Sequence, residues 1–267
     1  MPALDLLPPD GSATSLLVLL LAAAAAGWVD AVVGGGGLVQ LPALLLVGGL
    51  SPLQALATNK LASVAGTTTS ALTYLRRTGT DLRTALPMAA VAFGLSLLGA
   101  SVAARLPAEA IKPVIVVALV VVAAVTALRP SLGDLPRPRR EALAHYGLAM
   151  ALAAVIGFYD GVLGPGTGTF LVIGLVAVVG YDFLRASATA KVVNVATNLG
   201  ALAFFLPTGA VLVGLGVLMA AANVAGAYLG ARMAIARGNR FIRVVFLVVA
   251  GALVVRLSSD VWDDHRG

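Results

Sequence analysis

The stretch Gly27-Trp-Val-Asp-Ala-Val-Val-Gly-Gly-Gly-Gly-Leu-Val-Gln-Leu-Pro42 interrupts a long apolar run with a carboxylate, four consecutive glycines and a proline. Its pattern returns in the second half of the chain as Gly157-Phe-Tyr-Asp-Gly-Val-Leu-Gly-Pro-Gly-Thr-Gly-Thr-Phe170, with the aspartate and the first glycine of the loop at matching positions. Farther along, Ala57-Thr-Asn-Lys60 matches Ala188-Thr-Ala-Lys191. The chain is therefore predicted to be a two-fold repeat in which each copy contains an apolar segment broken at a glycine-rich loop.

The composition excludes a soluble surface. Of the 267 residues, 60% are apolar and 11% are charged, whereas a soluble domain carries roughly a quarter charged residues. The apolar runs are long and continuous, unlike the short alternating strands of a membrane β-barrel. The net charge of +6 is attributed to loop residues that set membrane orientation, so nucleic acid is not an expected partner.

The apolar segments predict an all-α integral membrane protein built from two repeats of about five segments each. Repeat 1 covers residues 15–128 and repeat 2 covers residues 143–257, with residues 129–142 as the linker. The segments lie at 15–33, 38–50, 54–75, 85–104 and 110–128 in repeat 1, and at 143–163, 169–180, 184–206, 210–231 and 239–257 in repeat 2.

The second segment of each repeat, 38–50 or 169–180, is shorter than the roughly 20 apolar residues that a spanning helix needs. Both segments are bounded by glycine and by a proline, Pro42 or Pro165. Short segments broken by glycine and proline at corresponding positions of two halves indicate a transporter binding site. The sequence leaves open whether these segments cross the membrane or return on the same side.

Arginines indicate the orientation of the segments. They follow segments three, five and nine, at Arg76, Arg77, Arg83, Arg129, Arg137, Arg139, Arg140, Arg232, Arg237, Arg240 and Arg243. Because basic loops remain in the cytoplasm, the tails 1–14 and 258–267 are predicted to be extracytoplasmic. Each half then crosses the membrane an odd number of times, so the two copies are inverted about a pseudo-two-fold axis in the membrane plane.

The two glycine loops are candidates for anion binding. Free backbone N–H groups and the positive end of a helix dipole favour an anion, and non-helical backbone at membrane depth persists only when buried in protein or facing a wet cavity. The alternative is that the glycines only allow close helix packing. The matching positions favour binding, with candidate residues Gly34, Gly35, Gly36, Gly37, Gln40, Gly164, Gly166, Thr167 and Thr169.

Lys60 and Lys191 lie inside apolar segments, whereas the other basic residues lie at loops or segment ends. A cation there costs a few kcal/mol, so each lysine should face the protein interior and have a partner. Helical spacing places hydroxyl or amide side chains on the same face as each lysine, which suits a small oxyanion. The alternatives are snorkelling and a structural ion pair. The candidate binding residues on these two segments are Thr58, Asn59, Lys60, Thr67, Lys191, Asn194 and Asn198.

Asp30 and Asp160 precede the glycine loops, and three roles remain open for them. They could pair with the lysines, carry protons or a cation coupled to transport, or cap a broken helix. The chain has no cysteine and only two histidines, His145 and His265. We therefore expect no catalytic residue, no metal site and no cofactor, and the protein is not expected to be an enzyme.

The chain resembles the TauE/SafE family of membrane permeases, also called the sulfite exporter or TSUP family. The resemblance rests on Gly34-Gly-Gly-Gly-Leu-Val-Gln-Leu-Pro42, Ala57-Thr-Asn-Lys60, Gly157-Phe-Tyr-Asp-Gly-Val-Leu-Gly-Pro-Gly-Thr-Gly168 and Ala188-Thr-Ala-Lys-Val-Val-Asn194. It implies a multi-pass permease of the bacterial inner membrane with duplicated halves, which moves sulfite or an organosulfonate. Many members of the family have no assigned substrate, so the resemblance leaves the anion open.

Four functions are compatible with these features. We favour a secondary transporter that exports a small oxyanion by alternating access around a midplane site, where both loops and both lysines converge. An anion channel would need a continuous polar pore, a membrane enzyme would use the two aspartates as acid and base, and a structural subunit would tolerate neutral residues at both lysines. The expected partners are a small anionic substrate and the lipid bilayer, with a homodimer as the candidate assembly.

Overall fold

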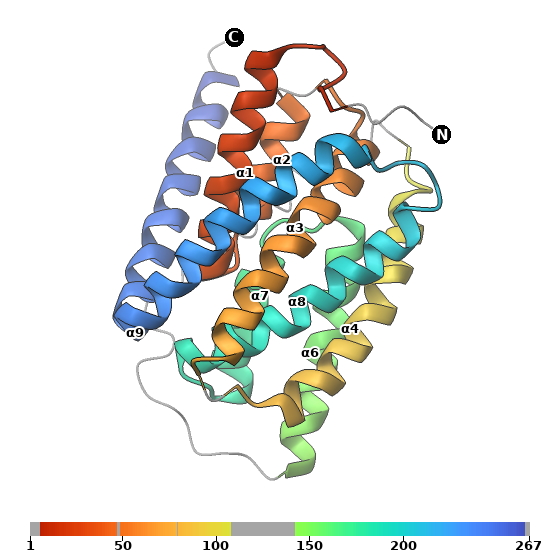
Figure 1. Cartoon of the computed structure of the whole chain (residues 1–267). Helices are drawn as coiled ribbons and strands as arrows, with labels where there is room; N and C mark the ends of the chain where they lie inside the picture. Colours follow the sequence, from red (N-terminus) through yellow and green to blue (C-terminus); the bar gives the residue numbers. More distant parts are fainter. Residues whose placement is uncertain (1–5, 47–48, 79, 108–141, 265–267) are drawn as a thin grey trace.

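The computed structural model describes residues 6–46, 49–78, 80–107 and 142–264, and every regular element in these ranges is a helix. The all-α prediction is therefore confirmed (Figure 1). The helices are α1 (Ala13–Val33), α2 (Gly37–Leu46), α3 (Pro52–Leu75), α4 (Leu82–Ala103), α6 (Ala142–Val162), α7 (Thr167–Gly174), the π-helix η1 (Leu175–Val179), α8 (Phe183–Phe205) and α9 (Val213–Asp264). The segment predicted at 110–128 and nearly all of the linker lie outside the described residues.

Five helices in the described part of the chain are long and apolar enough to cross a bilayer: Ala13–Val33, Leu82–Ala103, His145–Val162, Phe183–Phe205 and Val213–Ile242. Helix α3 has 24 residues and is long enough by length alone, about 36 Å. Its interior is more polar because it carries Asn59, Lys60 and Thr67, all buried. This polarity is tolerated because the protein, and not lipid, surrounds that face of α3.

The two short helices, α2 and α7, are at most half as long as a helix that crosses the membrane. Helix α2 has 10 residues and is about 15 Å long, against a hydrocarbon core of about 30 Å. Each short helix follows a turn that only glycine accommodates easily, because φ is +85° at Gly34, +88° at Gly164 and +75° at Gly166. These turns place the start of each short helix inside the protein.

Helix α9 is interrupted at Gly238, whose φ of 69° and ψ of −163° are not helical. The interruption lies between the two segments predicted at 210–231 and 239–257, and the second part extends beyond the predicted end to Asp264. After the bend, α9 returns along the bundle, so its end lies at the same end of the molecule as the start of α1 (Figure 1).

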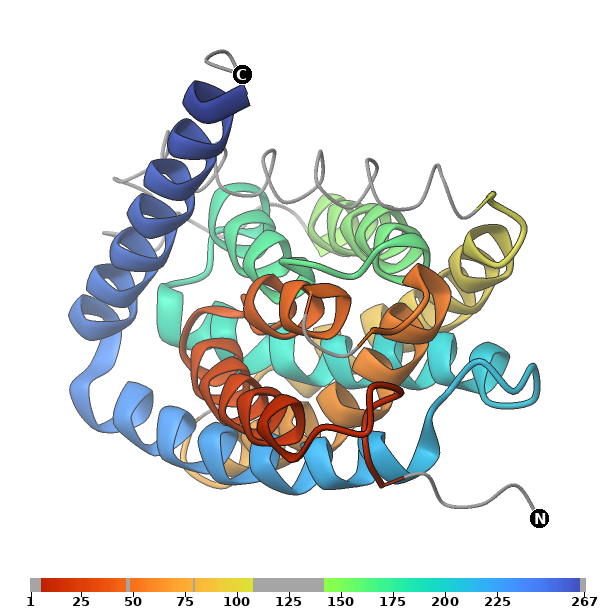
Figure 2. The same cartoon turned by 90° about the horizontal axis from the view of Figure 1, so that it is seen from above.

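Helices of the first half pack mainly on helices of the second half (Figures 1 and 2). Helix α1 lies along α9, and α4 lies along α6; α3 and α8 also contact one another. Glycines make these contacts close: a Cβ atom added at Gly226 of α9 would lie 1.9 Å from the Ala24 carbonyl oxygen of α1, and one at Gly99 of α4 would lie 2.2 Å from that of Phe158 in α6. Small residues of this kind let membrane helices approach backbone to backbone.

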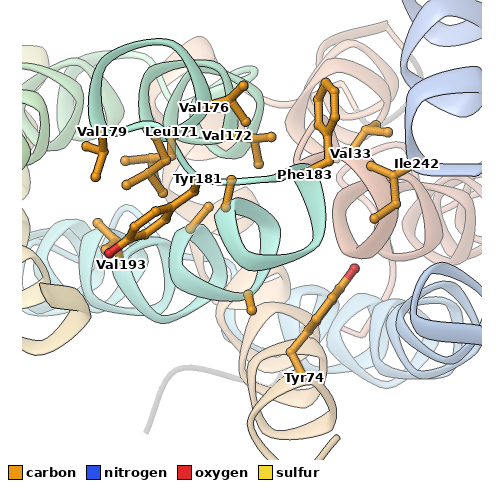
Figure 3. Close-up of a cluster of buried hydrophobic side chains, with 14 of the residues drawn as sticks. Val33, Tyr74, Leu171, Val172, Val176, Val179, Tyr181, Phe183, Val193 and Ile242 are labelled. Carbon is orange, nitrogen blue, oxygen red and sulfur yellow. The ribbon is translucent and has the colours of Figure 1, made fainter. Parts of the chain in front are cut away.

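A buried apolar cluster holds the end of α1, the helix that carries Asp30. Side chains of α7, η1 and α8 pack together with Val33 at the end of α1 and with Tyr74 of α3 (Figure 3). Tyr74 is fully buried, and its hydroxyl donates a hydrogen bond to the Ala31 carbonyl oxygen at 3.1 Å. The last turn of α1 is therefore held in a defined position.

Candidate functional site

The two glycine loops meet inside the protein. The backbone N–H of Thr169 donates to the Gly34 carbonyl oxygen at 3.0 Å, and the Thr169 hydroxyl donates to the Val33 carbonyl oxygen at 3.1 Å. A Cβ atom at Gly34 would lie 2.2 Å from the carbonyl carbon of Gly168, so the loops touch through their backbones. The contact brings the starts of α2 and α7 together. Most N–H groups of these first turns already have backbone partners in this conformation, such as Leu38 with the Gly35 carbonyl oxygen and Phe170 with that of Gly166.

A small cavity lies at this meeting point. Its volume is about 20 Å³, enough for a water molecule. Its lining consists of glycines, hydroxyls, amides and three ionisable side chains from both halves: Asp30, Gly34, Gly37, Asn59, Lys60, Ser63, Asp160, Gly164, Gly166, Thr167, Gly168, Asn194 and Asn198.

Lys60 is bound by Asp160 of the other half. Its Nζ lies 2.7 Å from Asp160 Oδ2 and donates to the Asp160 carbonyl oxygen at 2.7 Å. The other carboxylate oxygen, Oδ1, accepts a hydrogen bond from the Thr167 hydroxyl at 2.6 Å. A Cβ atom at Gly164 would lie 2.9 Å from Nζ, so the glycine leaves the space that the ammonium group occupies.

Lys191 is bound by Asp30 in the reciprocal arrangement. Its Nζ donates to the Asp30 carbonyl oxygen and lies 3.2 Å from Asp30 Oδ2. Asp30 and Asp160 both lie in the last turn of their helices, α1 and α6, where the helix dipole favours a cation. The Asp30 carbonyl oxygen also accepts a hydrogen bond from the Gly34 N–H at 2.8 Å. Each lysine therefore neutralises a carboxylate and also binds a helix end.

The four charges of this cluster sum to zero, and all of them except Asp30 are buried. Two lysines face two aspartates, and the lysine side chains are 2% exposed or less. An isolated charge would be costly to bury, and pairing with additional hydrogen bonds offsets that cost. In this conformation each lysine forms an ion pair with an aspartate of the other half, and the two pairs join the halves of the chain.

Comparison with known proteins identifies the family. The family model described as "Sulfite exporter TauE/SafE" matches residues 19–257. The chain belongs to the TauE/SafE family. It is therefore a multi-pass membrane protein of a permease family, as the glycine loops and the Ala-Thr-x-Lys motifs predicted.

Relatives of this TauE/SafE protein share most of its length. A protein of Sinorhizobium sp named "Probable membrane transporter protein ORF9" is 38% identical over 224 residues, which are 84% of this chain and 85% of that protein. "Probable membrane transporter protein YfcA" of Escherichia coli K12 is 33% identical over 84% of this chain and 82% of its own length. A "Probable membrane transporter protein" of Haemophilus influenzae is 32% identical over 84% and 87%. No solved structure matches the chain significantly.

Amide and hydroxyl groups of α3 and α8 form the remaining part of the cavity lining. Asn198 Nδ2 donates to the Asn194 carbonyl oxygen at 2.9 Å and reaches the Thr67 hydroxyl across the helix interface at 3.4 Å. Asn59 is buried, and its Oδ1 has no hydrogen-bond partner within the described part of the chain. The cavity thus offers polar groups from both long central helices in addition to the lysine.

Several predicted site residues do not line the cavity. Thr67 and Thr169 support it through the bonds described above, and Lys191 lies behind Asp30. Thr58 instead accepts a hydrogen bond from the Leu212 N–H at 3.1 Å. Gly35 and Gly36 belong to the loop but lie outside the lining.

Gln40 also lies elsewhere. Its Oε1 accepts a hydrogen bond from Asn223 of α9 at 2.8 Å, and both side chains are buried. Sequence analysis missed Asn223, although a lone amide in an apolar segment is a recognisable signal. It also omitted Ser63 and Gly168 from the candidate set, and both line the cavity. Ser63 lies three residues after Lys60, on the same helical face that the spacing indicated.

A second polar cluster lies at the end of the bundle where α4 and α8 begin. Asp81 Oδ2 accepts hydrogen bonds from the Tyr181 hydroxyl at 2.8 Å and from Arg185 Nη2 at 3.0 Å. Burial alone would raise the pKa of the Asp81 carboxyl, but the hydrogen bonds from Tyr181 and Thr84 and the charge of Arg185 lower this pKa below its ordinary value. Thr84 in turn bonds His145 of α6 at 3.1 Å, so the cluster joins three helices away from the cavity.

Proposed function

We propose that this TauE/SafE protein is a secondary transporter that exports a small oxyanion, such as sulfite or an organosulfonate, without chemically changing it. One observation carries the proposal: two buried lysines, one from each half, lie beside the meeting starts of two half-length helices at a polar cavity. Ammonium groups and the positive ends of helix dipoles favour the binding of sulfur oxyanions. The family and the names of the relatives support transport.

The proposed mechanism is alternating access between inverted halves. Reciprocal pairing supports the inversion: Lys60 pairs with Asp160 as Lys191 pairs with Asp30, and α1 lies on α9 as α4 lies on α6. Both lysines are paired with carboxylates here, so in the proposed cycle this conformation is the one without a bound anion. Anion binding must open at least one ion pair, and the anion then replaces a carboxylate as the partner of a lysine.

The proposed location is the bacterial inner membrane, with both ends of the chain extracytoplasmic. The start of α1 and the end of α9 lie at one end of the bundle (Figure 1). Arg76 and Arg77 lie after α3, and Arg237 and Arg240 lie at the bend of α9, both at the opposite end. The positive-inside rule places that opposite end in the cytoplasm.

The test of anion binding is thermal unfolding of the purified protein in a panel of sulfite, sulfate, thiosulfate, methanesulfonate and carboxylates. A ligand at 100 times its Kd stabilises the folded state by about 2.7 kcal/mol. The informative variant is Lys60→Gln/Asp160→Asn, which removes both charges of a pair and leaves no unpaired buried charge. Arg232→Gln, at an exposed arginine of α9, is the matched control.

We expect one class of oxyanion to raise the Tm of the wild type and of Arg232→Gln but not of the Lys60→Gln/Asp160→Asn variant. If no anion in the panel stabilises the wild type, or if the double variant responds equally, the anion-transporter proposal is wrong.

A further inference from the structure

The two lysine–aspartate pairs differ in how firmly each carboxylate is held. Both oxygens of Asp160 have partners, Lys60 at 2.7 Å and the Thr167 hydroxyl at 2.6 Å, and its side chain is 2% exposed. Asp30 lies 3.2 Å from Lys191 through Oδ2, and its side chain is 15% exposed. Asp30 therefore has the longer ion pair and the more accessible carboxylate.

A single sequence difference accounts for much of this inequality. Thr167 is the third residue after Gly164, and the corresponding third residue after Gly34 is Gly37, which has no side chain. The Thr167 hydroxyl thus bonds Asp160, whereas the matching residue near Asp30, Gly37, has no hydroxyl to donate. Asp30 lines the cavity directly, whereas its partner Lys191 does not.

The charge balance of the cavity then limits how an anion can bind. The ionisable groups that face Asp30 are Lys191 of α8, Lys60 and Tyr74 of α3, and Asp160 of α6. Helices α2 and α7 and the π-helix η1 have no ionisable side chain, and Tyr228 and Arg232 of α9 pair with one another at the surface. The four charges of the two pairs sum to zero, so an added monoanion would leave one uncompensated negative charge in a buried site.

We propose that Asp30 takes up one proton from solution when the anion binds, while Asp160 stays ionised as the partner of Lys60. The carboxylate of Asp30 becomes a neutral acid, and Lys191 is released to bind the anion together with Lys60, which lines the cavity and keeps Asp160 as its counterion. The net charge of the site then returns to zero. The acid loses the proton again when the anion leaves. One proton accompanies each anion, so export of a monoanion carries no net charge and is driven by the combined gradients of the anion and the proton. This inference rests on the proposed function.

Calorimetric titration of the purified protein with methanesulfonate tests the proton count, because a sulfonate does not itself titrate near neutral pH. Repeating the titration in buffers of different ionisation enthalpy gives the number of protons taken up. We expect about one proton per anion, with the Kd rising roughly tenfold per pH unit where Asp30 is ionised in the free protein. Asp30→Asn, which imitates the neutral acid, should bind without proton uptake and with a Kd independent of pH. Asp81→Asn, outside the cavity, is the control and should still take up about one proton for each anion bound.

Binding without proton uptake in the wild type overturns the inference and leaves the proposed function standing. Binding that depends on Na⁺ and not on protons has the same consequence, as does full proton uptake in a folded Asp30→Asn variant. If that variant does not fold, the wild-type proton count and pH dependence decide the matter alone. Absence of binding by every anion of the panel overturns the proposed function, and the inference with it.

Discussion

At the scale of residues, Lys60 and Lys191 decide what the centre of this protein can do. Each lysine is buried because it finds two acceptors on one aspartate, a carboxylate and the carbonyl oxygen at a helix end. The pairs are not equivalent, since the Thr167 hydroxyl donates to Asp160, whereas the matching position near Asp30 is Gly37, which has no side chain. Removing one partner should therefore lower the free energy of unfolding more at the Lys60–Asp160 pair than at the Lys191–Asp30 pair.

We expect Lys60→Gln to lower the free energy of unfolding by about 3–5 kcal/mol, because it leaves the Asp160 carboxylate buried without a cation. Lys191→Gln should cost less, since Asp30 is partly exposed. Adding Asp160→Asn to Lys60→Gln should restore most of the lost stability. Denaturation of the four proteins in detergent measures these differences, and equal losses at the two lysines would contradict the unequal strength assigned to the pairs.

At the scale of elements, the helices are positioned by contacts that only glycine permits. Helix α4 contains a built-in comparison: Gly99 faces the Phe158 carbonyl oxygen of α6, whereas a Cβ atom at Gly94 would meet nothing within 4 Å. The pairing of α4 with α6 holds the helix that carries Asp160, so this contact also supports the cavity.

Gly99→Ala should destabilise the protein by at least about 1–3 kcal/mol, because the added methyl group would lie 2.2 Å from backbone unless the helices separate. Gly94→Ala on the same helix should cause no loss, since alanine favours a helix over glycine. Thermal unfolding compares the two variants. A similar Tm for both would show that the α4–α6 contact is looser than described.

At the scale of the whole molecule, the features that could be predicted from the sequence are those that burial in a membrane imposes on polar groups. A lysine in an apolar segment must be buried with a partner, and a glycine-rich interruption must be buried in protein, so Lys60, Lys191 and both loops were found. Which aspartate pairs with which lysine depends on how the halves pack, and no local pattern contains it. For the same reason, the Gln40–Asn223 bond and the displacement of Thr58 from the cavity were not predicted.

The central claim is that the protein transports an anion across the membrane by binding it at the polar cavity. Flux of labelled methanesulfonate in proteoliposomes tests this claim most directly. The account predicts saturable flux that unlabelled methanesulfonate on the opposite side accelerates, as exchange through an alternating site requires, and loss of this flux in Lys60→Gln/Asp160→Asn. Flux that does not saturate and shows no such exchange would indicate a channel. Flux no greater than in empty liposomes, or equal flux in the double variant, would contradict the claim.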